Sequence, residues 1–239
     1  MIDLSLRGRL RARQPMVCLM MTSPNPDLVE IAAAAGVDFA ILDAQHGPIT
    51  AAHLPDAIRA GDAAGIPVLV RVPGMDRAFI LQSLEAGATG ILVPEIETAA
   101  QAQELVELAH YAPNGKRSVG AHARAQGYSK NKSFAEMREQ DAAVVVAVNI
   151  ETPLGVANAE EIMSNPGIDF VMIGVGDLKM LLGDGDEADR QYEEATRIIG
   201  ALGERLGVST TRSAANGNIL SHDTYTILYE ALHKYQSGR

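Results

Sequence analysis

The sequence predicts an α/β barrel, in which parallel strands alternate with crossover helices. Short runs that are apolar throughout, as in strands buried on both faces, alternate with longer stretches of helical periodicity. Polar residues follow five of these runs, where a βα-barrel enzyme carries its reacting groups: His46, Arg71, Glu95, Glu151 and Asp177. One domain, 1–239, is expected, because a chain of 239 residues that is 47% hydrophobic can bury one large core.

Each predicted element follows from its local pattern. Strands are predicted at the short apolar runs 16–21, 39–42, 68–70, 90–93, 144–150, 170–173 and 208–211. Helices are predicted where apolar residues recur at helical spacing, at 26–35, 52–64, 78–86, 99–109, 153–164 and 188–206. Gly36, Gly65 and Gly87 stand where a left-handed residue ends a helix, and Asp76 and Thr98 stand where a side chain can cap the next one.

Two segments interrupt the alternation. The stretch 111–137 is polar and rich in Gly, Ser, Asn and Lys, so a long functional or mobile loop is expected there. The runs 208–211 and 218–221 could be the last two strands, but six residues separate them and a parallel crossover needs about a dozen. Either the eighth strand is missing or the barrel closes irregularly. The helical spacing of 225–235 predicts a terminal helix that packs on the barrel or on a neighbouring subunit.

Composition excludes several classes of protein. The net charge of -10 disfavours binding to nucleic acid or to an anionic membrane. No apolar run reaches the roughly 18 residues of a membrane span, and the first residues have no signal-peptide pattern, so a cytoplasmic protein is expected. Cys18 is the one cysteine, which excludes an internal disulfide and is expected to be buried and inert. No glycine-rich nucleotide motif follows a strand.

Glu151 and Asp177 are the strongest candidates for chemistry. Side chains at the ends of adjacent parallel strands converge on one spot, and two carboxylates with water and a chelating substrate suit Mg²⁺ or Mn²⁺. The alternative is that each carboxylate only caps the helix that follows it.

His46, Asp43 and Arg71 form a second group of candidates. A histidine after a strand can exchange a proton near neutral pH, and Asp43, three positions earlier, could orient it or hold the loop. Arg71 offers fixed donors to an oxyanion or a carboxylate, unless it forms only a salt bridge at the strand end.

Six collinear motifs, which lie within roughly 16–182, resemble the HpcH/HpaI aldolases, a family of metal-dependent class II pyruvate aldolases. The motifs are L-D-A-Q-H-G-P (42–48), V-R-V-P (70–73), L-E-A-G-A-T-G-I-L-V-P (84–94), Y-A-P-N-G-K-R (111–117), I-E-T (150–152) and G-V-G-D-L (174–178). The resemblance implies a modified TIM (β/α)8 barrel. It also implies a trimer or a hexamer in which the C-terminal helix, 224–236, is exchanged between subunits.

The resemblance further implies an aldehyde-lyase that reversibly cleaves a 4-hydroxy-2-oxoacid into pyruvate, or an analogue, and an aldehyde. Glu151 and Asp177 would hold the divalent metal, Arg71 would stabilise the enolate, and His46 would be the acid–base group. By the same resemblance, the amides of Gly176 and Asp177 would receive the substrate carboxylate, and Glu85 would reach a histidine of a neighbouring subunit.

The chain departs from the family pattern close to these residues. Gln45, Ser118, Asn149, Val175 and Lys179 replace the usual glutamate, glycine, glutamine, proline and small residue. Asn149 and Lys179 are expected to contact substrate. These departures motivate a second hypothesis, a biosynthetic relative that condenses or decarboxylates oxoacids with altered metal use. A third is a non-catalytic barrel that serves in binding or assembly.

Overall fold

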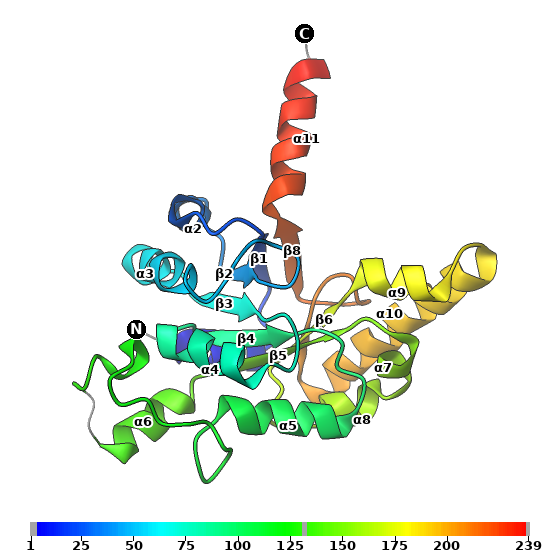
Figure 1. Cartoon of the computed structure of the whole chain (residues 1–239). Helices are drawn as coiled ribbons and strands as arrows, with labels where there is room; N and C mark the ends of the chain where they lie inside the picture. Colours follow the sequence, from blue (N-terminus) through cyan, green and yellow to red (C-terminus); the bar gives the residue numbers. More distant parts are fainter. Residues whose placement is uncertain (1–3, 131–132, 238–239) are drawn as a thin grey trace.

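The computed structural model describes residues 4–130 and 133–237, so positions 131 and 132 of the predicted loop lie outside the described residues. Eight parallel strands form one sheet in the order β7-β6-β5-β4-β3-β2-β1-β8, which curls into a nearly closed barrel (Figure 1). The α/β barrel predicted from the sequence is confirmed. The strands are β1 (Met16–Met21), β2 (Phe39–Asp43), β3 (Val68–Arg71), β4 (Gly90–Val93), β5 (Val145–Ile150), β6 (Phe170–Ile173), β7 (Ser209–Thr210) and β8 (Ile219–Asp223).

Five of the six helices predicted between strands are single helices in the structure: α2 (Pro26–Ala34), α3 (Leu54–Ala64), α4 (Arg77–Ala86), α5 (Ala99–Ala109) and α10 (Asp186–Leu206). The predicted helix 153–164 is instead two short helices, α7 (Pro153–Ala157) and α8 (Ala159–Met163). The break falls at Asn158, whose backbone leaves helical geometry (φ -97°, ψ 9°) and whose side chain donates to the Glu97 carbonyl at 2.8 Å. The predicted caps at Asp76 and Thr98 are confirmed.

A helix that the sequence analysis missed, α1 (Leu4–Arg11), closes the amino-terminal end of the barrel. Leu6 and Leu10 are fully buried in the barrel interior, in the same cluster as Phe39 and Phe170 at the starts of their strands. On the polar face, Arg7 and Arg11 both pair with Asp169, which precedes β6. This arginine-rich segment lacked the apolar periodicity of a core helix.

The barrel closes irregularly, as one of the two sequence alternatives predicted. β8 pairs along its length with β1, whereas β7 meets it through one parallel bridge, Thr211 to Ile219. β8 therefore starts level with the end of β7, so the chain needs no return crossover and a short loop suffices. The alternative that the eighth strand is missing is wrong.

The long loop predicted at 111–137 is shorter in the structure. It contains a 3-10 turn, Arg124–Gln126, and its last residues already belong to α6 (Phe134–Asp141). The start of α6 has a capping box, in which Ser133 accepts from the Glu136 amide and the Glu136 side chain accepts from Ser133. The S-x-x-E pattern signalled this start. A third unpredicted helix, α9 (Val175–Leu182), follows β6 directly.

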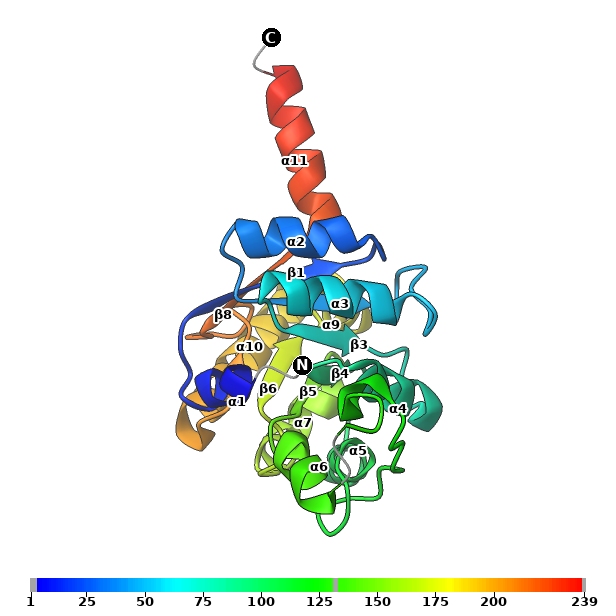
Figure 2. The ribbon, with the colours of Figure 1, turned by 90° about the vertical axis from the view of Figure 1, so that its left-hand side faces the viewer.

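The last helix, α11 (Thr224–Ser237), projects away from the barrel (Figures 1 and 2). No residue of α11 is buried, although it carries six large apolar or aromatic side chains: Tyr225, Ile227, Leu228, Tyr229, Leu232 and Tyr235. In β8 the side chains opposite the interior residue Ile219 are also uncovered, because Leu220 is half-buried and His222 is exposed. Among the described helices, none is long and apolar enough to cross a bilayer.

Candidate active site

A buried arginine–aspartate pair lies where β2 and β3 end. Asp43 and Arg71 are register partners, and the Asp43 carboxylate accepts from Arg71 Nε at 2.8 Å and from Nη2 at 2.5 Å. Burial alone would raise the pKa of Asp43, but the hydrogen bonds and charge of Arg71, with two backbone amides, hold it below its ordinary value. This fork fixes the orientation of the guanidinium group.

The loop that carries His46 is anchored to the same aspartate. Asp43 Oδ1 accepts from the backbone amides of Gln45 at 3.0 Å and His46 at 3.2 Å. A side chain at Gly47 would lie 2.6 Å from the carbonyl oxygens of Asp43 and Thr22, so the loop packs tightly over β1. Asp43 thus holds the loop through its backbone, and the His46 side chain is exposed to solvent.

Glu151, after β5, is a buried carboxylate with two fixed partners. Its Oε1 accepts from the Glu95 amide at 2.8 Å and its Oε2 from Asn149 Nδ2 at 2.5 Å. Burial raises the pKa of Glu151 above its ordinary value, and the negative charge of Asp177 raises it further. The hydrogen bond from the Glu95 amide and the positive charge of Arg71 lower the pKa, but they offset only part of this rise. Asp177 and Arg71 are therefore each close enough to Glu151 to affect its charge.

The local backbone allows this position of Glu151. Glu95 adopts a left-handed conformation (φ 55°), which costs energy for a side chain other than glycine and turns its amide toward the carboxylate. Gly174 begins α9 beside it, and a Cβ there would lie 2.1 Å from Glu151 Oε2. The sequence placed Glu95 among the polar residues that follow strands, but it did not indicate that the Glu95 amide holds Glu151, and it indicated no role for Gly174.

The capping alternative for the two carboxylates is not what the structure shows. Thr152, not Glu151, caps α7 by accepting from the Gly155 amide at 3.0 Å. Asp177 is exposed and lies in the first turn of α9, after Gly174 at the cap position. Both carboxylates are therefore free of the capping role.

Glu151 and Asp177 fit a hard divalent cation in their chemistry. Two carboxylates of like charge act on each other at one end of the barrel, and a cation between them would relieve the repulsion. Among the described residues no group of three or more His, Cys, Asp or Glu side chains could hold a metal. Further ligands would have to come from water and substrate oxygens, as in sites that keep several waters.

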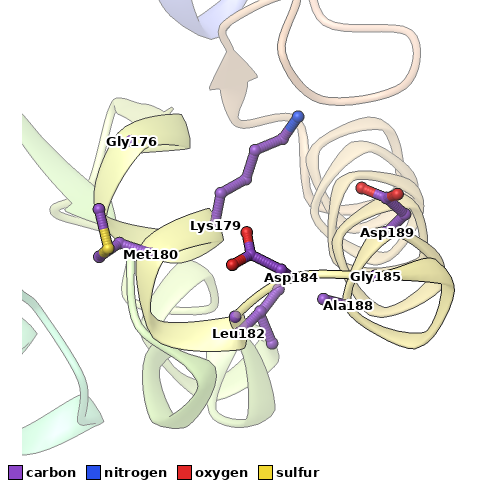
Figure 3. Close-up of a pocket in the computed structure, with 9 residues that line it drawn as sticks. Gly176, Lys179, Met180, Leu182, Asp184, Gly185, Ala188 and Asp189 are labelled. Atoms are coloured by element: carbon purple, nitrogen blue, oxygen red, sulfur yellow. The ribbon is translucent and has the colours of Figure 1, made fainter.

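Two of the predicted substrate contacts have different surroundings. Asn149 is buried beside Glu151, and its Oδ1 has no hydrogen-bond partner among the described residues. Lys179 extends into the space between α9 and α10 (Figure 3), where its Nζ lies 4.5 Å from the centre of the Tyr192 ring. This contact directs Lys179 toward α10. Lys179, Gly176 and Asp184 are among the residues that line a pocket of about 370 Å³ there.

Glu85 is not brought together with His46 of the same chain. It lies in the last turn of α4, which runs from the carboxyl end of β3 back to the amino-terminal end of β4. There it faces the loop at Gly120, where a Cβ would lie 1.9 Å from Glu85 Oε1. Within one chain, Glu85 and His46 therefore lie at opposite ends of the barrel.

Comparisons with known proteins agree with the fold and the motifs. The HpcH/HpaI aldolase/citrate lyase family model matches residues 17–217. A hydroxypyruvate/pyruvate aldolase of Agrobacterium fabrum is 32% identical and aligns with 88% of this chain and 81% of its own length. A 2-keto-3-deoxy-L-rhamnonate aldolase of Klebsiella pneumoniae is 35% identical, with 84% and 76% covered. A crystal structure of a family protein from Burkholderia cenocepacia is 27% identical, with a TM-score of 0.89 and 99% of each chain covered.

These findings bear directly on the predicted activity class. Both relatives are named as aldolases, which are carbon–carbon lyases, so the predicted class of enzyme is confirmed. The family match also extends over all six motifs on which the resemblance rested. The chain belongs to the HpcH/HpaI aldolase/citrate lyase family.

Proposed function

We propose that the protein cleaves a 4-hydroxy-2-oxoacid reversibly into pyruvate, or a close analogue, and an aldehyde, in a metal-dependent aldol reaction. The observation that carries the proposal is the convergence of three charges: Arg71 and Asp177 both act on the buried carboxylate of Glu151. One fixed cation beside two carboxylates suits a reaction that binds oxoacid oxygens and develops negative charge on an enolate.

In this proposal Glu151 and Asp177 hold Mg²⁺ or Mn²⁺. The bound ion supplies Lewis-acid polarisation of the 2-oxo group. Glu151 suits the role because the Glu95 amide and the Asn149 side chain fix both of its oxygens, each of which keeps a lone pair. The first-turn amides of α9, at Gly176 and Asp177, have no helical acceptor and would donate to the substrate carboxylate.

In the proposed reaction Arg71 stabilises the negative charge and His46 transfers the proton. The Asp43 pair occupies Nε and Nη2 of Arg71, so within the described residues Nη1 stays available to an enolate oxygen. His46 is exposed on a loop anchored to the same aspartate, so it can exchange a proton with the 4-hydroxyl group directly or through water. Asp43 thus positions both groups.

We also propose that the working protein is a homo-oligomer, a trimer or a hexamer, in which α11 crosses to a second copy. A helix with six exposed apolar or aromatic side chains and no buried residue needs a covering surface. The uncovered outer face of β8 offers one. In such an assembly the Glu85 side chain would reach the His46 side chain of another subunit. The single buried Cys18 agrees with a reducing, cytoplasmic location.

The decisive experiment measures pyruvate release from a generic 4-hydroxy-2-oxoacid with added Mg²⁺ or Mn²⁺ and with EDTA. We expect release that needs the metal. Glu151→Gln and Asp177→Asn should each lower turnover by at least about 100-fold and weaken Mn²⁺ binding measured by calorimetry. Asp56→Asn, at an exposed aspartate of α3, is the matched control. Metal-independent release, or no release under any condition, would contradict the proposal and direct attention to condensation chemistry.

A further inference from the structure

A pocket on the outside of the barrel combines apolar walls with two cationic side chains. It has a volume of about 210 Å³ and lies between α6 and the segment that follows α5, far from the barrel mouth. Its lining residues are Tyr111, Ala112, Arg117, Val119, Phe134, Met137 and Arg138. The two arginines are the only charged lining residues, so this is a cationic place on a protein of net charge -10.

Arg117 is a buried cation with incomplete pairing. Its side chain is 2% exposed, its nearest carboxylate oxygen is Asp141 Oδ1 at 3.7 Å, and its guanidinium lies 4.6 Å from the centre of the Tyr111 ring. Nε and Nη2 have no hydrogen-bond partner among the described residues. The other buried arginine–aspartate pair, Arg71 with Asp43, closes at 2.8 and 2.5 Å.

Asp141 does not close the gap in this structure, and its Oδ1 also has no hydrogen-bond partner among the described residues. Its Oδ2 already binds the His110 ring at 3.2 Å and accepts from the Tyr111 amide at 3.1 Å. Buried polar groups are almost always paired, so free donors on a buried arginine beside a cavity point to an absent acceptor. Planar guanidinium groups match carboxylates in geometry.

We propose that this pocket binds a small carboxylate with an apolar body, independently of the reaction proposed for the barrel mouth. The carboxylate pairs with Nε and Nη2 of Arg117 at the floor, and the exposed Arg138 adds charge at the rim. The apolar body packs against Met137, Val119 and Phe134. Nε and Nη2 of Arg117 are covered by protein atoms, so in this proposal the guanidinium turns toward the pocket when the carboxylate binds.

Calorimetric titration of the full chain with benzoate tests the proposal. We expect one benzoate per chain, with benzamide, the neutral analogue, at least about tenfold weaker because it lacks the charge. Acetate should also bind more weakly, since it lacks the apolar body. Pyruvate should not displace benzoate, because it is proposed to bind at the barrel mouth.

Variants locate the binding. Arg138→Gln should weaken benzoate binding about threefold or more, and Val119→Trp should abolish it by filling the pocket. The matched control is Arg190→Gln, because Arg190 is an exposed arginine on α10 paired with Glu187. Circular dichroism verifies that each variant is folded. The proposal is overturned if no saturable binding occurs, if benzamide binds equally well, if pyruvate displaces benzoate, or if Val119→Trp binds normally. Benzoate binding that is lost as the chain self-associates would instead assign the pocket to a second copy.

Discussion

At the scale of single residues, the Asp43–Arg71 pair links stability to pH. The pKa of Asp43 lies below that of an unfolded carboxyl group, about 3.9. Its contribution is therefore fully present above that value and is lost as pH falls through the lowered folded pKa. Asp43→Asn should lower the free energy of unfolding by about 3 kcal/mol at pH 7, because it leaves a buried arginine without its partner.

Urea unfolding of both proteins between pH 7 and pH 3 measures this contribution. The difference between wild type and Asp43→Asn should shrink as pH falls below about 4, because Asp43 then begins to take up a proton in the unfolded chain while it is still charged in the folded one. Asp56→Asn is the control, because Asp56 is exposed and pairs only with a neighbour on its own helix. A difference that stays constant across this range would show that the cost of the substitution is packing rather than charge.

Cys18 gives a second prediction at this scale. Burial raises the pKa of its thiol to about 12, and hydrogen bonds offset only part of that rise. Since the thiolate is the reactive form, the folded protein should not react with a thiol reagent at pH 8, whereas one thiol per chain should react after denaturation. The absorbance of the thiolate released from a chromogenic disulfide reagent measures thiol reactivity in the folded and in the denatured protein. Rapid reaction of the folded chain would mean that the barrel interior opens.

Residue types showed which side chains could react but not what holds them. The sequence predicted the positions of Arg71 and Glu151, because each follows an apolar run. It could not predict that the Glu95 amide supports Glu151, because that contact requires a left-handed backbone at a residue other than glycine. Nor could the sequence predict that Lys179 contacts Tyr192, because the two residues lie on different helices and the contact depends on how those helices pack.

At the scale of elements, α1 closes the amino-terminal end of the barrel, and its buried residues should contribute to stability. Leu10 is fully buried in the interior cluster, so Leu10→Ala should cost about 3 kcal/mol of unfolding free energy through the cavity it leaves. Ile31→Ala, on α2, should change little because Ile31 is 61% exposed. Chemical denaturation compares the two. Equal, small effects would show that α1 is dispensable for stability.

The elements that were predicted correctly were those with strong apolar periodicity. The strands and the five helices between them could be predicted because each strand buries a continuous apolar run and each helix buries one apolar face. α9 was missed because Met180 and Leu181 are 82% and 59% exposed, so its apolar residues do not follow the pattern of a buried face. α1 was missed because its sequence is rich in arginine and shows no apolar periodicity, although Leu6 and Leu10 are buried in the barrel interior.

At the scale of the whole molecule, the irregular closure and the projecting helix are connected. β8 starts level with the end of β7, so no crossover helix covers that part of the sheet, and α11 continues outward from β8. The sequence indicated the irregular closure as one of two alternatives, because six residues cannot form a crossover, and it predicted a terminal helix from the helical spacing of 225–235. It could not indicate the direction of α11, because no residue of this helix is buried against the barrel and its apolar side chains therefore do not fix its orientation.

Removal of α11 tests whether a second copy supplies that surface. A chain that ends at residue 223 should form a smaller species than wild type in light scattering, with circular dichroism that shows an intact barrel. The paired change Leu228→Glu with Leu232→Glu should act in the same way, because both leucines are exposed in one chain and a charge would be costly where a second copy covers them. Glu230→Gln, on the same helix, is the control. If truncated and wild-type chains have the same mass, α11 does not hold subunits together, and its apolar side chains must serve another partner.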